Sequence, residues 1–537
     1  MQTTPRYLHT QRNLVWLVLL VALAFCPAAA CPEEQAQLPA NPAPAASLPP
    51  FTPEHRDRKL DRQIRKILQS SDAQQGFWGI EVVEVGGKAL YQRESNHLFI
   101  PASNMKLFTT AAALEKLGPD YVFRTTVESD TTPGSQGRVE NLYLVGRGDP
   151  NLGARTLPYS YHGPEQAADR FLQDLADQVA ARGVREVTGT LVADDSYFVW
   201  EPFAPNWAAD DLEWGYGAPV TALAFHDNSL TLRVRPAAKA GDPASVLLEP
   251  VADYFQLHNN VVTSAAGTAK NYFLERLPGS MQLDVWGQIP LDAGENTDTV
   301  AVADPPRLVA ELFRQALEKR GIRVDGDMVV RHSSRREVAA SPEPAPGSSS
   351  RVVLAEHRSP PLAETIKVIN KESENLHAEM LLRTLGRVLN GHGSLAGGLD
   401  ALNVFVAQQV GIVAGETYFS DGSGLSREDL LTPHAMVKLL LYMAQAQNFQ
   451  AFLDSLPVSG IDGTLAHRLT GDDLKGKIHA KTGSVEHVNT LSGYMDLPSG
   501  RRLVLSIMGN NHPLASQQGR ETVDAVATAI YKRFATR

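Results

Sequence analysis

The tetrad Ser103-Asn104-Met105-Lys106 stands where the extended segment HLFIPA gives way to LFTTAAALEKLG, a run with the pattern of an amphipathic helix. Residues three apart on a helix share a face, so Ser103 at the helix start and Lys106 point the same way. A serine hydroxyl needs a neighbouring base to become a nucleophile. Lys106 can be that base only where burial or a nearby cation lowers its pKa from about 10.4. A Ser-x-x-Lys pair also arises by chance about once or twice in a chain of this length.

Two further motifs make a chance match a poor explanation. Ser373-Glu374-Asn375 begins the helical run NLHAEMLLRTLG, and Lys481-Thr482-Gly483 ends GKIHAKTG, whose alternation predicts a strand. The ordered set Ser-x-x-Lys, Ser-x-Asn and Lys-Thr-Gly is typical of penicillin-binding proteins and class A β-lactamases. The sequence therefore predicts acyl transfer through a serine nucleophile.

The N-terminal segment predicts export. Arg6 and Arg12 precede the apolar run LVWLVLLVALAF, which is followed by Pro27 and by Ala28-Ala29-Ala30. A charged start, an apolar centre and small residues at the end are the layout of a secretory signal peptide. The alternative is a membrane anchor, but the apolar run has about a dozen residues where a spanning helix needs about 20.

The chain has 2 cysteines, Cys26 and Cys31, and both lie in or beside this signal, so we expect the folded body to contain no disulfide. Cys31 directly follows three alanines, an arrangement that resembles a bacterial lipoprotein cleavage box with Ala in place of the usual Leu. Two outcomes stay open: a lipid anchor at Cys31, or ordinary cleavage after Ala30. The Pro- and Ala-rich stretch that follows would be a semi-extended tether in either case.

Size and charge limit the function classes. With 537 residues the chain is long enough for two or three domains with full cores. The net charge of −10 argues against nucleic acid as a partner. The 15 histidines form no His-Glu-x-x-His pair, so we expect no metal site and no cofactor.

The order of expected elements predicts one catalytic domain built from both chain ends. Strands near the start (GFWGIEVVEV, KALYQRES) and near the end (GKIHAKTG, NTLSGYMDLP, RRLVLSIMGNN) would form one sheet, with helices at 59–71 and 515–535. Short alternating runs between the first two motifs predict one or two inserted β-rich domains that end in a low-complexity linker. The expected division is a signal at 1–30, a tether at 31–58, catalytic parts at 59–125 and 351–537, and the insertion at 126–350.

From about residue 60 to the C-terminus, the chain resembles the class C low-molecular-mass penicillin-binding proteins, the D-alanyl-D-alanine carboxypeptidase/endopeptidase family. The resemblance rests on PASNMKLFTTAAALEKLG, LVGRGDPNL, ADDSYF with the Trp/Tyr-rich stretch after it, KESENLHAEMLLRTLG, SDGSGLSREDLLTP and KIHAKTGS. It implies an α+β fold, the α/β/α sandwich of penicillin-recognising serine hydrolases and β-lactamases, with inserted domains. The implied partners are peptidoglycan stem peptides as substrates and β-lactams as covalent inhibitors, in the periplasm or cell envelope.

The catalytic roles follow from what each step requires. Ser103 would attack the carbonyl of the penultimate D-Ala while Lys106 accepts its proton. Ser373 would relay that proton to the leaving amine, and Asn375 would bond both the substrate backbone and Lys106. Lys481 would place a second cation in the cleft, which helps to keep Lys106 neutral and attracts the terminal carboxylate.

Five further residues are expected to bind substrate. Thr482 would donate to the terminal carboxylate, Gly483 would let substrate add to the strand edge, and the N–H of Ser484 would complete an oxyanion hole with that of Ser103. The resemblance implies that Asp149 binds the amino end of the stem peptide, although Asp-Pro also suits a plain turn. Arg427 is either a carboxylate clamp or an ordinary surface charge. Ser423 and Ser426 lack the Gly-x-Ser-x-Gly spacing of a nucleophile elbow and are predicted to be structural.

Three alternatives belong to other function classes. A β-lactamase or esterase of the same fold would need a water-activating carboxylate, and the chain has no Glu-x-x-Leu-Asn segment. A non-catalytic peptidoglycan-binding protein would not need every reactive position filled, and a metallopeptidase would need a histidine cluster. The sequence leaves open the oligomeric state and the balance between carboxypeptidase and endopeptidase activity.

Overall fold

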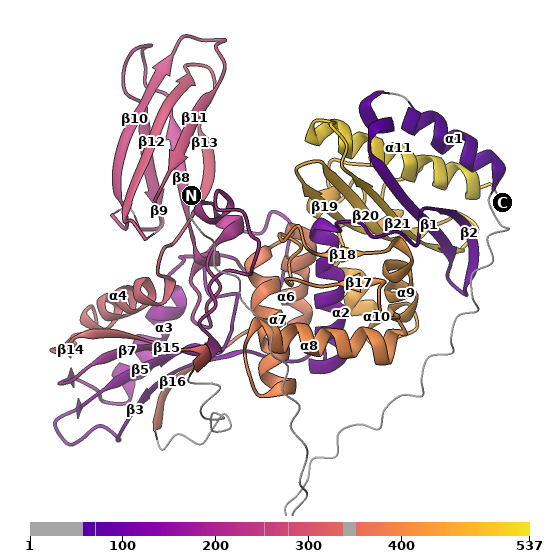
Figure 1. Cartoon of the computed structure of the whole chain (residues 1–537). Helices are drawn as coiled ribbons and strands as arrows, with labels where there is room; N and C mark the ends of the chain where they lie inside the picture. The colour runs from indigo at the N-terminus through magenta and orange to yellow at the C-terminus, as the bar shows by residue number, and fades with distance from the viewer. Residues whose placement is uncertain (1–56, 70, 252, 278, 337–350, 537) are drawn as a thin grey trace, which may run out of the picture. The chain divides into compact units, whose positions relative to one another are not determined.

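A five-stranded antiparallel sheet made from both ends of the chain is the centre of the catalytic domain in this computed structural model, which describes residues 57–69, 71–251, 253–277, 279–336 and 351–536 (Figure 1). Its strands are β1 (Phe77–Glu84), β2 (Lys88–Arg93), β19 (Ile478–Val485), β20 (Val488–Asp496) and β21 (Arg502–Asn510), in the order β19-β20-β21-β1-β2. The strands expected at both chain ends are therefore present and share one sheet. The strand with the Lys-Thr-Gly motif, β19, lies at its edge.

Side chains alternate between the two faces of a strand, and in this sheet both faces carry apolar side chains. Helices therefore cover each face. On β21, Leu503, Leu505 and Ile507 are buried with α1 (Arg58–Gln69) and α11 (Ser516–Phe534). Val504 and Met508 point to the opposite face, which packs against α9 (Pro433–Met443). The two terminal helices contact each other and close the first face.

The helical layer on the second face carries the first two motifs. Its elements are a 3₁₀ turn η2 (Ala102–Met105), α2 (Lys106–Leu117), α6 (Leu362–Lys367), a π-helical turn η6 (Val368–Glu372), α7 (Asn375–Asn390), α8 (Leu395–Phe405), η7 (Val406–Val410), α9 and α10 (Phe449–Ser455). Leu107, Phe108 and Ala111 of α2 are fully buried, and α2 packs against α7. Figure 1 shows α2 beside α7, and the turn η2 at its start contacts β19 and β20 of the sheet. The α+β sandwich expected from the sequence is confirmed.

The first inserted unit is a mixed five-stranded sheet in the order β15-β7-β5-β3-β16 with two helices on it. Its elements are β3 (Arg124–Ser129), β5 (Leu142–Val145), β7 (Leu191–Val199), β15 (Met328–Ser333), β16 (Val352–Arg358), α3 (Arg170–Ala181) and α4 (Pro305–Glu318). A small parallel ladder joins β4 (Arg138–Val139), β6 (Glu186–Val187) and β14 (Arg323–Val324). The helix predicted at PPRLVAELFRQALEKRG is α4, and Asp304 caps it by accepting from the N–H of Arg307.

The second inserted unit consists of two three-stranded sheets, β10-β12-β11 and β13-β8-β9. Its strands are β8 (Ser229–Arg235), β9 (Ser245–Glu249), β10 (Gln256–Ser264), β11 (Asn271–Glu275), β12 (Gln282–Pro290) and β13 (Asn296–Ala301). Leu232 of β8 and Val285 of β12 are fully buried in a common core. The insertion therefore contains two β-rich units, where the sequence analysis expected one or two.

The insertion ends later than the sequence pattern indicated. The expected return to the catalytic domain was residue 351, just after the low-complexity linker. In the structure β16 pairs with β3 in the inserted sheet, and the catalytic fold resumes with α6 after Arg358. The end of the linker can be recognised from the change in composition. The pairing of β16 with β3 depends on hydrogen bonds between distant segments, which composition does not show.

The predicted signal peptide, Cys31 and most of the tether lie outside the described residues. Within the described part of the chain, no helix has the length and apolar character needed to cross a membrane.

Replacing Ile507 with alanine should destabilise the catalytic domain strongly. Ile507 is fully buried on β21 opposite Ile80 of β1 and Leu491 of β20, so the change leaves a cavity in the middle of the sheet. Such truncations typically cost about 2–5 kcal/mol. Thermal unfolding followed by circular dichroism should show a lower midpoint than in Val329→Ala, a truncation of a half-exposed side chain on β15. Equal midpoints would contradict the assignment of Ile507 to the core.

Candidate active site

Ser103 and Lys106 meet at the start of α2 as the tetrad predicts. Ser103 lies in the 3₁₀ turn η2 and is half-buried, whereas the Lys106 side chain is fully buried. Lys106 Nζ lies 2.9 Å from Ser103 Oγ, within hydrogen-bond distance. A nucleophile and a base in direct contact are what serine catalysis requires.

Two more acceptors hold the Lys106 side chain. Its Nζ donates to Asn375 Oδ1 at 2.5 Å and to the main-chain carbonyl of Ser423 at 2.7 Å. The Asn375 amide is itself oriented, because its Nδ2 donates to the carbonyl of Tyr216 at 2.8 Å. Tyr216 belongs to the inserted segment, so the insertion fixes which end of the Asn375 amide faces the base.

Ser373 and Lys481 form a second contact, close enough to Lys106 for its charge to act on Lys481. Lys481 Nζ donates to Ser373 Oγ and to the Thr482 carbonyl, each at 2.9 Å. Ser373 follows the π-helical turn η6 and has a left-handed backbone, with φ of 67°. A non-glycine residue in this region is uncommon and is found where surrounding structure imposes it, often at functional sites. The five predicted catalytic residues are thus brought together.

The strand β19 runs beside the nucleophile turn, and Gly483 makes that approach close. A Cβ at Gly483 would lie 2.2 Å from Thr490 Oγ1 and 2.7 Å from the Pro101 carbonyl. Thr490 Oγ1 in turn donates to that carbonyl at 2.8 Å. The glycine is therefore required by contact with the chain two residues before Ser103, in addition to the edge position expected from sequence. Thr482 Oγ1 bonds Thr464 Oγ1 at 2.8 Å, and Ser484 is exposed at the strand end.

Burial controls the protonation of both lysines. It lowers the pKa of Lys106 to about 8, against the opposing pull of carboxylates from Asp421, Glu374, Glu379 and Asp429. Burial also lowers the pKa of Lys481 well below its usual value, and the Lys106 cation adds to that shift. The sequence-based hypothesis gave two causes for a lowered pKa of Lys106, burial and the Lys481 cation. In the structure burial is the largest cause, and the charges that act on Lys106 are those of carboxylates.

The two weaker predictions, Asp149 and Arg427, make no hydrogen bond or ion pair with the five predicted catalytic residues. Asp149 is fully buried, with Oδ1 accepting from the N–H of Asn151 at 3.0 Å and Oδ2 3.7 Å from Nε2 of His357. This geometry is that of a turn, and a role in binding substrate stays a prediction. Arg427 is about half exposed and lies 3.7 Å from Glu486 in the turn between β19 and β20. Its surroundings suit a surface charge as well as a carboxylate clamp.

Sequence reasoning missed the two main-chain carbonyls that complete the site, those of Ser423 and Tyr216. The prediction that Ser423 and Ser426 are structural agrees with their side chains, which are buried: Ser423 Oγ donates to Asp421, and Ser426 Oγ accepts from the N–H of Glu428. The Ser423 carbonyl, however, touches the base itself. No cluster of three or more metal-ligating side chains occurs in the part of the chain that the structure describes.

A buried lysine bonded to a serine on a helix start, with a serine, an asparagine and a second lysine around it, defines a serine hydrolase of the penicillin-recognising type. A model of the D-Ala-D-Ala carboxypeptidase 3 (S13) family matches residues 60–530, and the chain belongs to this family. The family resemblance inferred from the sequence is thereby confirmed.

Individual relatives agree over most of the chain. A D-alanyl-D-alanine carboxypeptidase of Actinomadura sp. (strain R39) is 37% identical over 492 residues, which are 88% of this chain and 84% of that protein. The carboxypeptidase DacB of Haemophilus influenzae is 26% identical over 75% of this chain and 79% of its own. The crystal structure of penicillin-binding protein 4 (dacB) from H. influenzae has a TM-score of 0.74 at 22% identity, covering 88% of this chain and 99% of that one. A second structure of that protein, in complex with a β-lactam, has a TM-score of 0.69.

The rate of Ser103 acylation should rise with pH through a limb near 8. Lys106 accepts a proton only as the neutral amine, and its pKa of about 8 means that this form grows as pH rises past that value. Below the limb, the rate should fall about tenfold for each pH unit. Stopped-flow labelling with a fluorescent penicillin measures it. Lys367→Met, which removes a part-buried lysine paired with Glu364, should leave the limb in place. A rate that stays flat between pH 6 and 9 would contradict the role of Lys106.

Proposed function

We propose that the chain is a serine-type D-Ala-D-Ala carboxypeptidase that cleaves the ends of peptidoglycan stem peptides through an acyl-enzyme on Ser103. The observation that carries the proposal is the 2.9 Å contact between Ser103 Oγ and Lys106 Nζ, in a setting where burial lowers the pKa of the lysine to about 8. A lysine in that state is a base at neutral pH, which an exposed lysine is not.

In the acylation step, Lys106 takes the Ser103 proton as Oγ attacks the carbonyl carbon of the penultimate D-Ala. The C–O bond forms, the peptide C–N bond then breaks, and the leaving amine of the terminal D-Ala receives a proton. Ser373 supports the relay of that proton, since its Oγ accepts from Lys481 and its own hydroxyl hydrogen is left to donate. Water then attacks the ester by the reverse sequence and releases Ser103.

Substrate would lie along the second half of β19, the edge strand, because Ile478 and Ala480 in its first half already bond Ser459 and Pro457. An edge strand offers free backbone groups, to which an extended peptide adds as a further strand. Lys481 and Thr482 would bind the terminal carboxylate, and the N–H groups of Ser103 and Ser484 would stabilise the oxyanion. A carboxylate placed beside Lys481 would raise the pKa of this lysine again, so binding would take up a proton.

The names of the relatives support this substrate class. The relative from Actinomadura is a D-alanyl-D-alanine carboxypeptidase, and the H. influenzae protein is a penicillin-binding protein whose structure contains a β-lactam. We infer that β-lactams acylate Ser103 of this chain as well. If both free D-Ala and monomers from cross-linked dimers appear on incubation with intact peptidoglycan, the chain is also an endopeptidase.

We infer further that the protein works outside the cytoplasm, in the periplasm or cell envelope, because its first 30 residues have the layout of a signal peptide. Mass spectrometry of the mature N-terminus tests this inference. A diacylglycerol-modified Cys31 would mean a lipid anchor, an unmodified Cys31 at the N-terminus would mean ordinary cleavage, and an intact Met1 would refute a cleaved signal peptide.

Ser103→Ala should abolish both penicillin labelling and release of D-Ala while leaving the thermal midpoint within a few degrees of the wild type. The change removes the nucleophilic oxygen but keeps the turn, since alanine fits wherever a half-buried serine does. Ser129→Ala, which removes a buried hydroxyl in the inserted sheet, is the control and should keep both activities. Stable penicillin labelling of Ser103→Ala would refute the proposal.

Lys481→Ala should harm substrates with a free terminal carboxylate much more than the same peptides with a terminal amide. Losing a charge-assisted hydrogen bond in a buried site typically costs about 1.5–3 kcal/mol, or about 10- to 150-fold, and only the carboxylate makes such a bond. The measurement is kcat/KM for each peptide pair. Lys477→Ala, at an exposed lysine just before β19, should change neither. Equal losses for acid and amide would mean that Lys481 does not recognise the carboxylate.

A further inference from the structure

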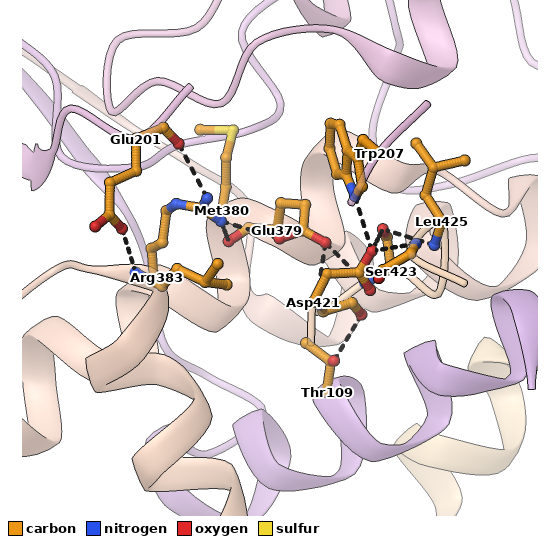
Figure 2. Close-up of polar contacts among 12 residues, drawn as sticks. Thr109, Glu201, Trp207, Glu379, Met380, Arg383, Asp421, Ser423 and Leu425 are labelled. Carbon is orange, nitrogen blue, oxygen red and sulfur yellow. Dashed lines mark hydrogen bonds and ion pairs between the residues drawn. The ribbon is translucent and has the colours of Figure 1, made fainter. Parts of the chain in front are cut away.

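The loop Asp421–Ser426 lies against the catalytic helix α2, and two buried carboxylates hold its backbone: Asp421 from within the loop and Glu379 from α7 (Figure 2). Glu379 of α7 accepts from the N–H groups of Gly422 and Ser423 at 2.8 and 2.9 Å. Asp421 accepts from Ser423, Gly424 and Ser426 at 3.0, 2.6 and 2.7 Å. Glu379, Asp421 and Ser423 are all fully buried. Because a buried N–H without an acceptor is costly, these bonds fix the loop backbone.

Fixing an N–H also fixes the carbonyl of the same peptide, since the two point in opposite directions from a planar trans unit. Asp421 holds the N–H of Gly424, so the Ser423 carbonyl is turned the other way, where it accepts from Lys106 Nζ at 2.7 Å. Glu379 holds the N–H of Ser423, and the Gly422 carbonyl accepts from Thr109 Oγ1 of α2 at 2.7 Å. Each carboxylate thus aims one carbonyl at the helix that carries the base.

Hydrogen bonds also link the two carboxylates to a segment that lies far away in the sequence. Glu379 is paired with Arg383 at 2.9 Å, both fully buried, and Arg383 donates to the Glu201 carbonyl at 3.1 Å. Asp421 accepts from the indole N–H of Trp207 at 2.9 Å. Glu201 and Trp207 lie in the segment that follows β7 of the insertion, so the network joins the insertion to the catalytic helix.

The same loop also touches the turn that holds the nucleophile. Gly424 has φ of +79°, and a Cβ there would lie 1.9 Å from the carbonyl of Ala102, the residue before Ser103. The loop therefore contacts the nucleophile turn and the base at once.

We propose that Asp421, supported by Glu379, is a positioning residue for the general base: it orients the Ser423–Gly424 peptide so that the Ser423 carbonyl holds Lys106 Nζ against Ser103 Oγ. This inference rests on the proposed function, because it assumes that Lys106 activates Ser103. It assigns a catalytic purpose to two buried carboxylates that touch neither the nucleophile nor the substrate.

The charges of these residues predict a pH effect with a definite sign. Four carboxylates act on Lys106: Glu374 just before α7, Glu379 of α7, Asp421 of the loop and Asp429 just before β18 (Leu430–Leu431). The Lys481 ammonium of β19 is also coupled to it by charge. Each carboxylate favours the charged form of Lys106 and so raises its pKa. Removing the charge of Asp421 should lower that pKa, and loss of the Ser423 carbonyl as an acceptor acts in the same direction. The rising limb of the acylation profile should then move to lower pH.

Asp421→Asn tests the proposal in the full chain. The amide keeps the size of the side chain but offers only one acceptor oxygen, so N–H groups that now share two carboxylate oxygens lose a partner. Fluorescent penicillin, titrated to count active sites, should acylate this variant about 10- to 100-fold more slowly, as expected when a base is displaced by an ångström or less. The limb should lie at lower pH than in the wild type. An unchanged rate, or a slower rate with an unmoved limb, would overturn the proposal.

Asp195→Asn is the matched control. Asp195 is also a buried aspartate that holds two backbone N–H groups, those of Ala222 and Leu223, but it lies in the insertion. Its loss should lower the thermal midpoint and leave the limb in place. A limb shift as large as that of Asp421→Asn would overturn the proposal, because it would show that any buried carboxylate has the same effect.

If Asp421→Asn does not fold, the Thr109→Val variant tests whether the loop positions the helix that carries Lys106. This variant keeps every charge and deletes only the hydroxyl that bonds the Gly422 carbonyl. It should acylate about fivefold more slowly than Thr384→Val, the equivalent of one ordinary hydrogen bond. Thr384 is a buried threonine of α7 whose hydroxyl bonds back to its own helix at Met380. Equal rates for the two variants would overturn the proposal.

The wild-type protein separates the two levels of inference. If it takes up no penicillin on Ser103, the proposed function fails before any variant is compared. If it is labelled and the variants behave like the wild type, only the positioning role fails.

Discussion

The active site depends on burying one lysine without giving it a counter-ion in direct contact. Lys106 is fully enclosed, and its Nζ is bonded by a hydroxyl, an amide oxygen and a main-chain carbonyl. All three acceptors are neutral, so they satisfy the hydrogens of the group without compensating for a full charge. The carboxylates of Glu379 and Asp421 do not contact Lys106. They accept hydrogen bonds from backbone N–H groups, and Glu379 also pairs with an arginine. This separation keeps the pKa of Lys106 near 8, where a carboxylate in contact would hold the lysine charged.

Much of this could be predicted from the sequence because the decisive residues are of rare types in a fixed local context. Ser103 and Lys106 one helical turn apart, and Lys481 at the end of an alternating strand, specify both chemistry and local geometry. The alternation of Leu503, Leu505 and Ile507 likewise predicts a strand with a buried face, and the structure has it. Patterns of this kind are local, and local patterns survive in the primary sequence.

The contacts that could not be predicted are made by main-chain groups, which every residue has. The Ser423 and Tyr216 carbonyls hold the base and the Asn375 amide, and no residue type signals a carbonyl that points in a particular direction. The position of β16 is a similar case, since its partner β3 lies more than two hundred residues earlier. Asp149 is a different case: its Asp-Pro context fits a turn and a binding site equally well, and its burial and its bond to the N–H of Asn151 describe the turn without testing a role in binding.

The Tyr216 carbonyl and the Trp207 indole both come from the insertion, and both bond residues of the catalytic core. The insertion thus supplies hydrogen-bond partners to residues of the catalytic core and is more than a separate domain attached to it. A shortened version that joined α2 directly to α6 would expose the Asn375 amide to rotation and leave Asp421 with one donor fewer. Deleting the insertion alone would therefore remove the partners that two groups of the catalytic core have in this structure.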